Sequence, residues 1–83
     1  MNRKEIAEKI KQLLSDQLGV ETDSIKEDSN FVTEFNADSL DAVEIIMEIE
    51  DLFNIKVDDK EAELITTTKG LVDLVENKLK EEQ

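Results

Sequence analysis

The side chains able to do chemistry in this sequence are few, and two on which most enzymes rely are missing. The 83 residues include no Cys and no His, which excludes a thiol nucleophile, a thiolate zinc site and the usual general base. The serines are Ser15, Ser24, Ser29 and Ser39. Without His, none of them can be activated in a Ser-His-Asp arrangement. A lysine or carboxylate base stays possible, but the chain is poorly equipped for catalysis by itself.

Ser39 differs from the other serines because a strongly helical segment begins there. Asp38 before it and Asp41 after it suit the first turn of a helix, where side-chain oxygens and negative charge are favoured. The simplest interpretation of Asp38-Ser39 is therefore a helix cap. An anion attached to Ser39 would also face free N–H groups and the positive end of the helix dipole. Ser39 is thus a candidate position for a phosphodiester.

Helices must position this serine, because apolar residues recur at helical spacing almost throughout the chain. The expected helices cover residues 3–17, 39–53, 57–64 and 68–80. The third is short, and we expect Asp58 and Glu61 to cap its start. The predicted fold class is all-α, a small antiparallel bundle of three long helices and one short one, forming a single domain over residues 1–83.

Turn signals and apolar stripes support these helices. Asn2 with Glu5 fits a capping box at the start of the first helix, and Gly19 fits a left-handed cap at its end. The stripes expected to be buried are Ile6, Ile10, Leu13 and Leu14 in the first helix and Leu71, Val72, Val75 and Leu79 in the last. Residues 20–37 form a long connection, which we expect Phe31 and Val32 to anchor in the core.

The segment 39–53 carries apolar residues on two sides, although a helix in a small bundle needs only one buried face. The face expected in the core consists of Ala42, Ile45, Ile46, Ile49, Leu52 and Phe53. Leu40, Val43 and Met47 lie on the far side and form what we call the ridge. The acidic residues beside the ridge are Asp41, Glu44, Glu48 and Asp51, with Glu50 on its other flank. Complete burial would remove these charges from water, so we expect the ridge to be exposed as a docking surface.

The charge balance restricts the partners that this surface can bind. With 22 acidic and 10 basic side chains, the formal net charge is −12. Such a surface repels nucleic acids and anionic membranes and attracts basic protein surfaces. The sequence contains no signal-peptide core and no apolar run of membrane-spanning length. We therefore expect a monomer in the cytoplasm or an organelle matrix, without nucleic-acid binding or membrane insertion.

A longer stretch around Ser39 resembles the signature of acyl carrier proteins. The resemblance starts from Phe31-Val32-Thr33-Glu34-Phe35-Asn36-Ala37-Asp38-Ser39-Leu40-Asp41-Ala42-Val43-Glu44. It continues through Ile45-Ile46-Met47, Phe53, Ala62-Glu63 and Ile65-Thr66-Thr67, and includes Gln17-Leu18-Gly19-Val20. The Ala-Asp-Ser-Leu-Asp core resembles the type used in bacterial and organellar fatty acid synthesis.

This resemblance implies a carrier that is not itself an enzyme. A phosphopantetheinyl transferase, using Mg²⁺ of its own, would move 4′-phosphopantetheine from coenzyme A to the Ser39 hydroxyl. Asp38 would help to position that transfer. The thiol of the arm would hold the growing fatty acyl chain as a thioester, so that the cofactor supplies the thiol that a chain without Cys lacks. No metal site of the carrier itself is expected.

The resemblance also assigns the two faces of the second helix. Leu40, Val43 and Met47, together with Asp41, Glu44, Glu48, Glu50 and Asp51, would dock on basic patches of fatty acid synthase enzymes and acyltransferases. The residues implied to line the space for the acyl chain are Phe31, Ile46, Ile49, Ala62 and Ile65. Two departures from the family pattern stand out. Asn36 replaces the usual Gly, and Asn tolerates left-handed backbone better than other residues with a side chain. The segment Val57-Asp58-Asp59 lacks the usual Pro.

Three other interpretations remain open. A specialised carrier of the D-alanyl, polyketide or peptidyl kind would share the serine at a helix start. An acidic calcium-binding protein is disfavoured because no Asp-x-Asp-x-Asp-Gly loop with its terminal Glu is present. An unmodified scaffold bundle would have the same fold but would never accept the prosthetic group.

Overall fold

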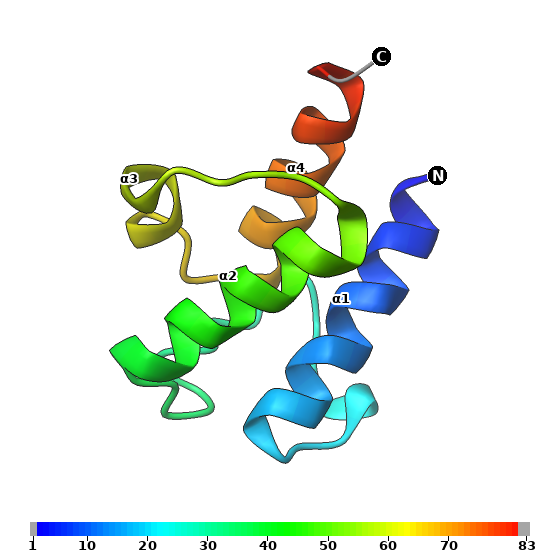
Figure 1. Ribbon diagram of the computed structural model, residues 1–83. Helices are drawn as coiled ribbons and strands as arrows, with labels where there is room; N and C mark the ends of the chain where they lie inside the picture. Colours follow the sequence, from blue (N-terminus) through cyan, green and yellow to red (C-terminus); the bar gives the residue numbers. More distant parts are fainter. Residues whose placement is uncertain (1, 82–83) are drawn as a thin grey trace.

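The computed structural model describes residues 2–81, and within them the secondary structure is helical (Figure 1). The elements are α1 (Arg3–Leu18), the short 3-10 helix η1 (Thr22–Ser24), α2 (Ser39–Phe53), α3 (Asp59–Glu63) and α4 (Thr68–Glu81). Extended pairing in this part of the chain is limited to one isolated bridge between Asn30 and Thr67. The all-α prediction is confirmed, and the three long helices lie within one residue of their predicted bounds.

Helix α1 is capped at Asn2 and Gly19 as predicted, although of the capping box expected between Asn2 and Glu5 only one of the two bonds is found among the described residues. The side chain of Asn2 accepts the N–H of Glu5 at 2.9 Å. Gly19 has φ 70° and donates its N–H to the carbonyl of Ser15, closing the helix in the left-handed conformation that glycine adopts without a Cβ penalty.

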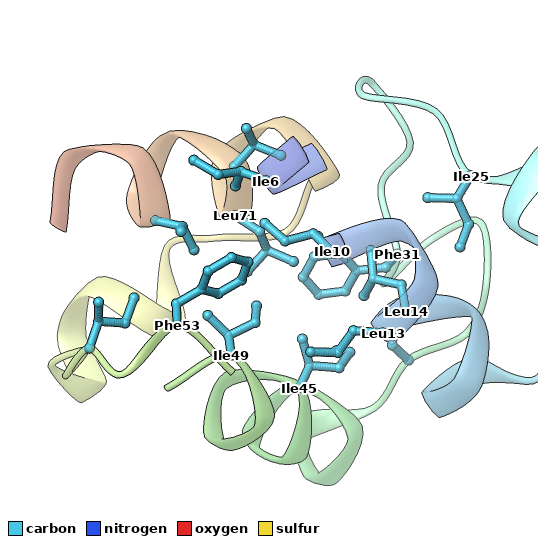
Figure 2. Packing of buried hydrophobic residues seen from close by; sticks show 14 residues of the cluster. Ile6, Ile10, Leu13, Leu14, Ile25, Phe31, Ile45, Ile49, Phe53 and Leu71 are labelled. Carbon is cyan, nitrogen blue, oxygen red and sulfur yellow. The ribbon is translucent and has the colours of Figure 1, made fainter. Parts of the chain in front are cut away.

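The core lies where α1 packs against both α2 and α4. Helices α1 and α4 run antiparallel, so the two ends of the chain lie at the same end of the molecule, and α2 crosses obliquely (Figure 1). Figure 2 shows Ile45, Ile49 and Phe53 of α2 pointing toward Ile10 of α1 and Leu71 of α4. The four residues of the predicted α1 stripe are buried. Of the four residues predicted to be buried in α4, only Leu79 is partly exposed. No helix within residues 2–81 is long and apolar enough to cross a bilayer.

Of the two residues predicted to anchor the long connection in the core, only Phe31 does so. Phe31 is buried, whereas Val32 is 40% exposed. The backbone N–H of Phe31 donates to the carbonyl of Thr66 at 3.0 Å, which directs its ring into the core. The N–H of Val32 donates to Oδ1 of Asn30 in a turn, and the adjacent side chain therefore points outward. The prediction that Val32 is an anchor was wrong because residues 31–34 form a turn that leaves the Val32 side chain facing water.

Helix α3 is shorter than predicted and starts two residues later. Asp58 precedes it in extended conformation, φ −68° and ψ 146°, and its side chain makes no capping hydrogen bond, so the expected cap with Glu61 was wrong. The N–H of Val57 instead donates to Oε2 of Glu50 at 3.0 Å. This bond fixes the connection to α2 and leaves only a five-residue helix.

Candidate functional site

The N-terminus of α2 is held by a complete capping box. Oδ1 of Asp38 accepts the N–H of Asp41 at 2.9 Å, and Oδ2 of Asp41 accepts the N–H of Asp38 at 3.3 Å. Ser39 is the first helical residue and is exposed. Among the described residues no partner is found for the backbone N–H of Ser39 or Leu40. An anion attached to Ser39 would therefore meet unpaired donors and the positive end of a 15-residue helix.

The surroundings of the four serines single out Ser39. The hydroxyl of Ser15 donates to the carbonyl of Val20. Ser29 is buried, and its Oγ accepts the N–H of Lys26. Ser24 is exposed but ends the three-residue η1. Only Ser39 combines an exposed hydroxyl with the start of a long helix, which is what covalent attachment of a phosphodiester requires.

The predicted ridge on α2 is exposed in the structure. The exposed fractions are 64% for Leu40, 55% for Val43 and 58% for Met47. The first of these residues, Leu40, directly follows Ser39 on α2. Large apolar side chains this exposed are common singly, but three in succession on one helix face are typical of a contact surface. The opposite face supplies Ile45, Ile49 and Phe53 to the core, so the helix has two apolar faces as predicted.

The acidic residues of α2 differ in how freely they can reach a partner. Glu48 and Asp51 are exposed. Glu44 is exposed as well, and its Oε2 accepts from the Gln17 amide of α1. Asp41 is half-buried within the capping box, and Glu50 is half-buried because it accepts the N–H of Val57. No basic side chain lies on α2, so every charged residue of this helix is acidic.

Leu52 is the residue of α2 whose burial the helical periodicity predicts wrongly. It was predicted in the core and is 48% exposed. With Leu13 and Lys9 of α1 it lines a shallow groove beside Glu48 and Asp51. Leu52 lies at the edge of the apolar arc, and the crossing of α1 over α2 covers the centre of that arc only. Ile46, at the other edge of the arc, is half-buried for the same reason, and Ala42 is half-buried in the first turn of the helix.

The residues predicted to line an acyl space come from the long connection, from α2, and from α3 and the connection that follows it. Phe31 and Ile49 are fully in the core, and Ile46 and Ile65 pack against it. Ala62 is half-buried on α3. A Cβ added to Gly70 would come within 3.1 Å of Cγ2 of Ile65, so the start of α4 lies directly against this group. The sequence alone marks Gly70 only as a weak helix residue.

Comparison with known families and proteins agrees with this geometry. Residues 8–75 match the family described as "Phosphopantetheine attachment site". The chain is 40% identical over 79 residues to an acyl carrier protein of Thermosynechococcus vestitus, covering 95% of this chain and 98% of that protein. It is 43% identical over 79 residues to an acyl carrier protein of Guillardia theta, with the same coverage.

Solved structures resemble the fold over nearly its whole length. The acyl carrier protein of Thermotoga maritima superposes with a TM-score of 0.85 at 31% identity, covering 100% of this chain and 96% of that one. The acyl carrier protein of Enterococcus faecalis gives a TM-score of 0.81 at 31% identity, covering 94% of this chain and 99% of that one.

Proposed function

This chain belongs to the acyl carrier protein family, and from that premise we propose that Ser39 is the residue to which its phosphopantetheine arm is attached. The protein is a carrier rather than a catalyst, and it bears an acyl chain on phosphopantetheine for fatty acid synthesis. The observation that carries the assignment to Ser39 is its exposed side chain on the first residue of a long helix, where backbone N–H groups have no partner within the helix.

The chain's own residues contribute position and charge at this site. The Asp38–Asp41 capping box fixes where the helix begins and so keeps the Ser39 hydroxyl at its end, outside the hydrogen-bonded ladder. The N–H groups of Ser39 and Leu40 are available to donate hydrogen bonds to the oxygens of a phosphodiester. When bound, the arm supplies a thiol that carries an acyl group as a thioester. We propose that the protein receives the arm as the substrate of a phosphopantetheinyl transferase that binds beside Asp38.

We propose that the ridge and its acidic neighbours dock the carrier on basic patches of fatty acid synthase enzymes and acyltransferases. The exposed apolar side chains would provide contact, and Glu44, Glu48 and Asp51 would steer approach and set the orientation. Asp41 and Glu50 would contribute charge but little direct contact, because each is tied to a backbone N–H.

We propose that the acyl chain is held along the inner side of α2, between Phe31, Ile46 and Ile49 on one side and Ala62 and Ile65 on the other. These residues share an apolar character, and three of them are only partly buried. Helix α3 packs less extensively than the long helices, which would let this side of the molecule widen around a chain.

Intact mass spectrometry tests the attachment site directly. Incubation with coenzyme A and a phosphopantetheinyl transferase is expected to add one arm to the wild-type protein and none to Ser39→Ala. Ser24→Ala removes the other exposed serine hydroxyl and should be modified like the wild type. Circular dichroism of Ser39→Ala should show an intact fold, because Asp38 provides the cap. An arm gained by Ser39→Ala would show that the site lies elsewhere.

A further inference from the structure

Within residues 2–81, one buried hydroxyl has no hydrogen-bond partner. Oγ1 of Thr68 is inaccessible and makes no hydrogen bond with any described residue. Thr68 is 0% exposed, and its neighbours on the inner face of α4 are Leu71 and Val72. Because buried polar groups are nearly always hydrogen-bonded, an orphan hydroxyl in a core needs an explanation. Valine has almost the same shape and would fill the site without that cost.

The bridge between the long connection and the residue before α4 places this hydroxyl on the same face as a second one, that of Ser29. The N–H of Thr68 donates to the carbonyl of Ser29 at 3.1 Å, and the N–H of Phe31 donates to the carbonyl of Thr66 at 3.0 Å. These bonds pair Ser29 with Thr68 on either side of the Asn30–Thr67 bridge. Residues opposed in this way point to the same face, and the burial of Ser29, Phe31 and Thr68 shows that the face is the core.

The two hydroxyls have hydrogen-bonding capacity left. Oγ of Ser29 accepts the N–H of Lys26 at 2.9 Å, so its O–H proton is still available to donate. Thr68 can both donate and accept. Phe31 lies on the same face, and Ile65 packs against the core and lies against the start of α4 at Gly70. Both belong to the proposed acyl space. Figure 2 shows the ring of Phe31 in the same part of the core as Leu71, one turn after Thr68.

We propose that Thr68, with Ser29 beside it, binds the oxygen of an acyl chain that carries a hydroxyl or keto group. This inference rests on the proposed function, since the chain must first enter the space beside Phe31. A saturated chain would leave the Thr68 hydroxyl unpaired, whereas an oxygenated chain would satisfy it. The carrier would therefore hold oxygenated cargo more firmly than saturated cargo of the same length, and Thr68 would be the residue that distinguishes them.

A double-mutant cycle tests the proposal by removing the hydroxyl group from Thr68, from the acyl chain, or from both. Wild-type protein and Thr68→Val would be loaded with amide-linked arms that resist hydrolysis, carrying octanoyl, 3-hydroxyoctanoyl or 7-hydroxyoctanoyl groups. Urea unfolding then gives the equilibrium constant for each. For each protein, the unfolding constant with a hydroxylated arm is divided by the unfolding constant with octanoyl. For at least one hydroxylated arm this ratio should be about fivefold lower in the wild type than in Thr68→Val, which is the effect of one net hydrogen bond. Without cargo, Thr68→Val should be at least as stable as the wild type, because it removes the orphan group.

Controls separate this inference from the function on which it depends. Thr33→Val deletes an exposed hydroxyl in the long connection and should behave like the wild type with every arm. If octanoyl itself fails to stabilise the wild type, the proposed acyl space is wrong and this inference falls with it. If octanoyl stabilises the protein but both hydroxylated arms act equally on wild type and Thr68→Val, only the role of Thr68 is overturned. The same result is expected if an ordered water satisfies the hydroxyl.

Discussion

At the scale of single residues, two asparagines adopt the left-handed backbone conformation that glycine usually adopts. Asn36, three residues before the proposed attachment site, and Asn54, the C-cap of α2, both have φ 55°. Left-handed backbone costs an ordinary L-residue about 1–2 kcal/mol, and Asn is among the few that visit it routinely. The sequence predicts this conformation for Asn36 and does not single out Asn54. The two asparagines turn the chain immediately before and after the helix that presents Ser39.

Substitution of Asn36 should therefore change stability through the backbone. Asn36→Ala is expected to lower the free energy of unfolding by about 1 kcal/mol, whereas Asn36→Gly should lose none of it. Urea denaturation of the two variants measures the difference. Asn54→Ala and Asn54→Gly should show the same order, since φ is the same. Equal stability of the Ala and Gly variants at both positions would contradict the backbone explanation.

At the scale of elements, α2 is divided between the core and the surface. Its inner face supplies Ile45, Ile49 and Phe53 to the packing against α1, and its outer face leaves the ridge and the acidic residues in water. Removing charge from the outer face should therefore leave the fold intact while weakening partner encounter.

Glu44→Lys tests this division of the helix. The substitution loses the contact with Gln17 and places a positive charge beside the ridge. We expect kcat/KM of a synthase enzyme acting on the loaded carrier to fall several-fold, more steeply at low salt, because steering between opposite charges is screened by ions. The Tm should change little.

The matched control is Glu8→Lys, which makes the same change of charge on the exposed side of α1. It should reduce turnover much less than Glu44→Lys does. Unchanged kinetics for Glu44→Lys with several partner enzymes would remove the acidic face of α2 from the docking surface.

At the scale of the whole molecule, strong negative charge opposes compactness. The net charge is −12, yet Arg3 draws three carboxylates together. Its guanidinium contacts Asp73 at 2.7 Å, Glu27 at 3.4 Å and Glu76 at 3.5 Å, joining α1, the long connection and α4. The hydrogen bond with Asp73 raises the pKa of Arg3 above its ordinary value. Elsewhere most acidic side chains are exposed and repel one another.

Cations should stabilise the protein by relieving this repulsion. Within residues 2–81 no group of three or more acidic side chains is placed to hold a metal ion, so we expect weak, diffuse binding. Mg²⁺ and Ca²⁺ should both raise the Tm, with about 4–8 °C for each 1 kcal/mol of repulsion removed. NaCl at equal ionic strength should reproduce much of the effect. Melting curves that respond to neither ion nor salt would refute this account.

The sequence by itself determined the local features of this protein. The caps at Asn2, Gly19 and Asp38 were predicted correctly because each depends on residues within one helical turn. The start of α2 at Ser39 follows from such a cap, and the ridge follows from helical periodicity. The proposed attachment site could therefore be located before any packing was known.

Only the tertiary structure decided which edges of the helices are covered. Leu52 and Val32 are apolar but are left 48% and 40% exposed by the elements around them, and Glu50 is acidic but accepts the backbone N–H of Val57. The orphan hydroxyl of Thr68 likewise becomes visible only when the bridge to the long connection buries it. Periodicity gives the direction of a side chain around its own helix. Its burial depends on the crossing angle and length of the neighbouring elements, which are set by contacts between residues far apart in the chain.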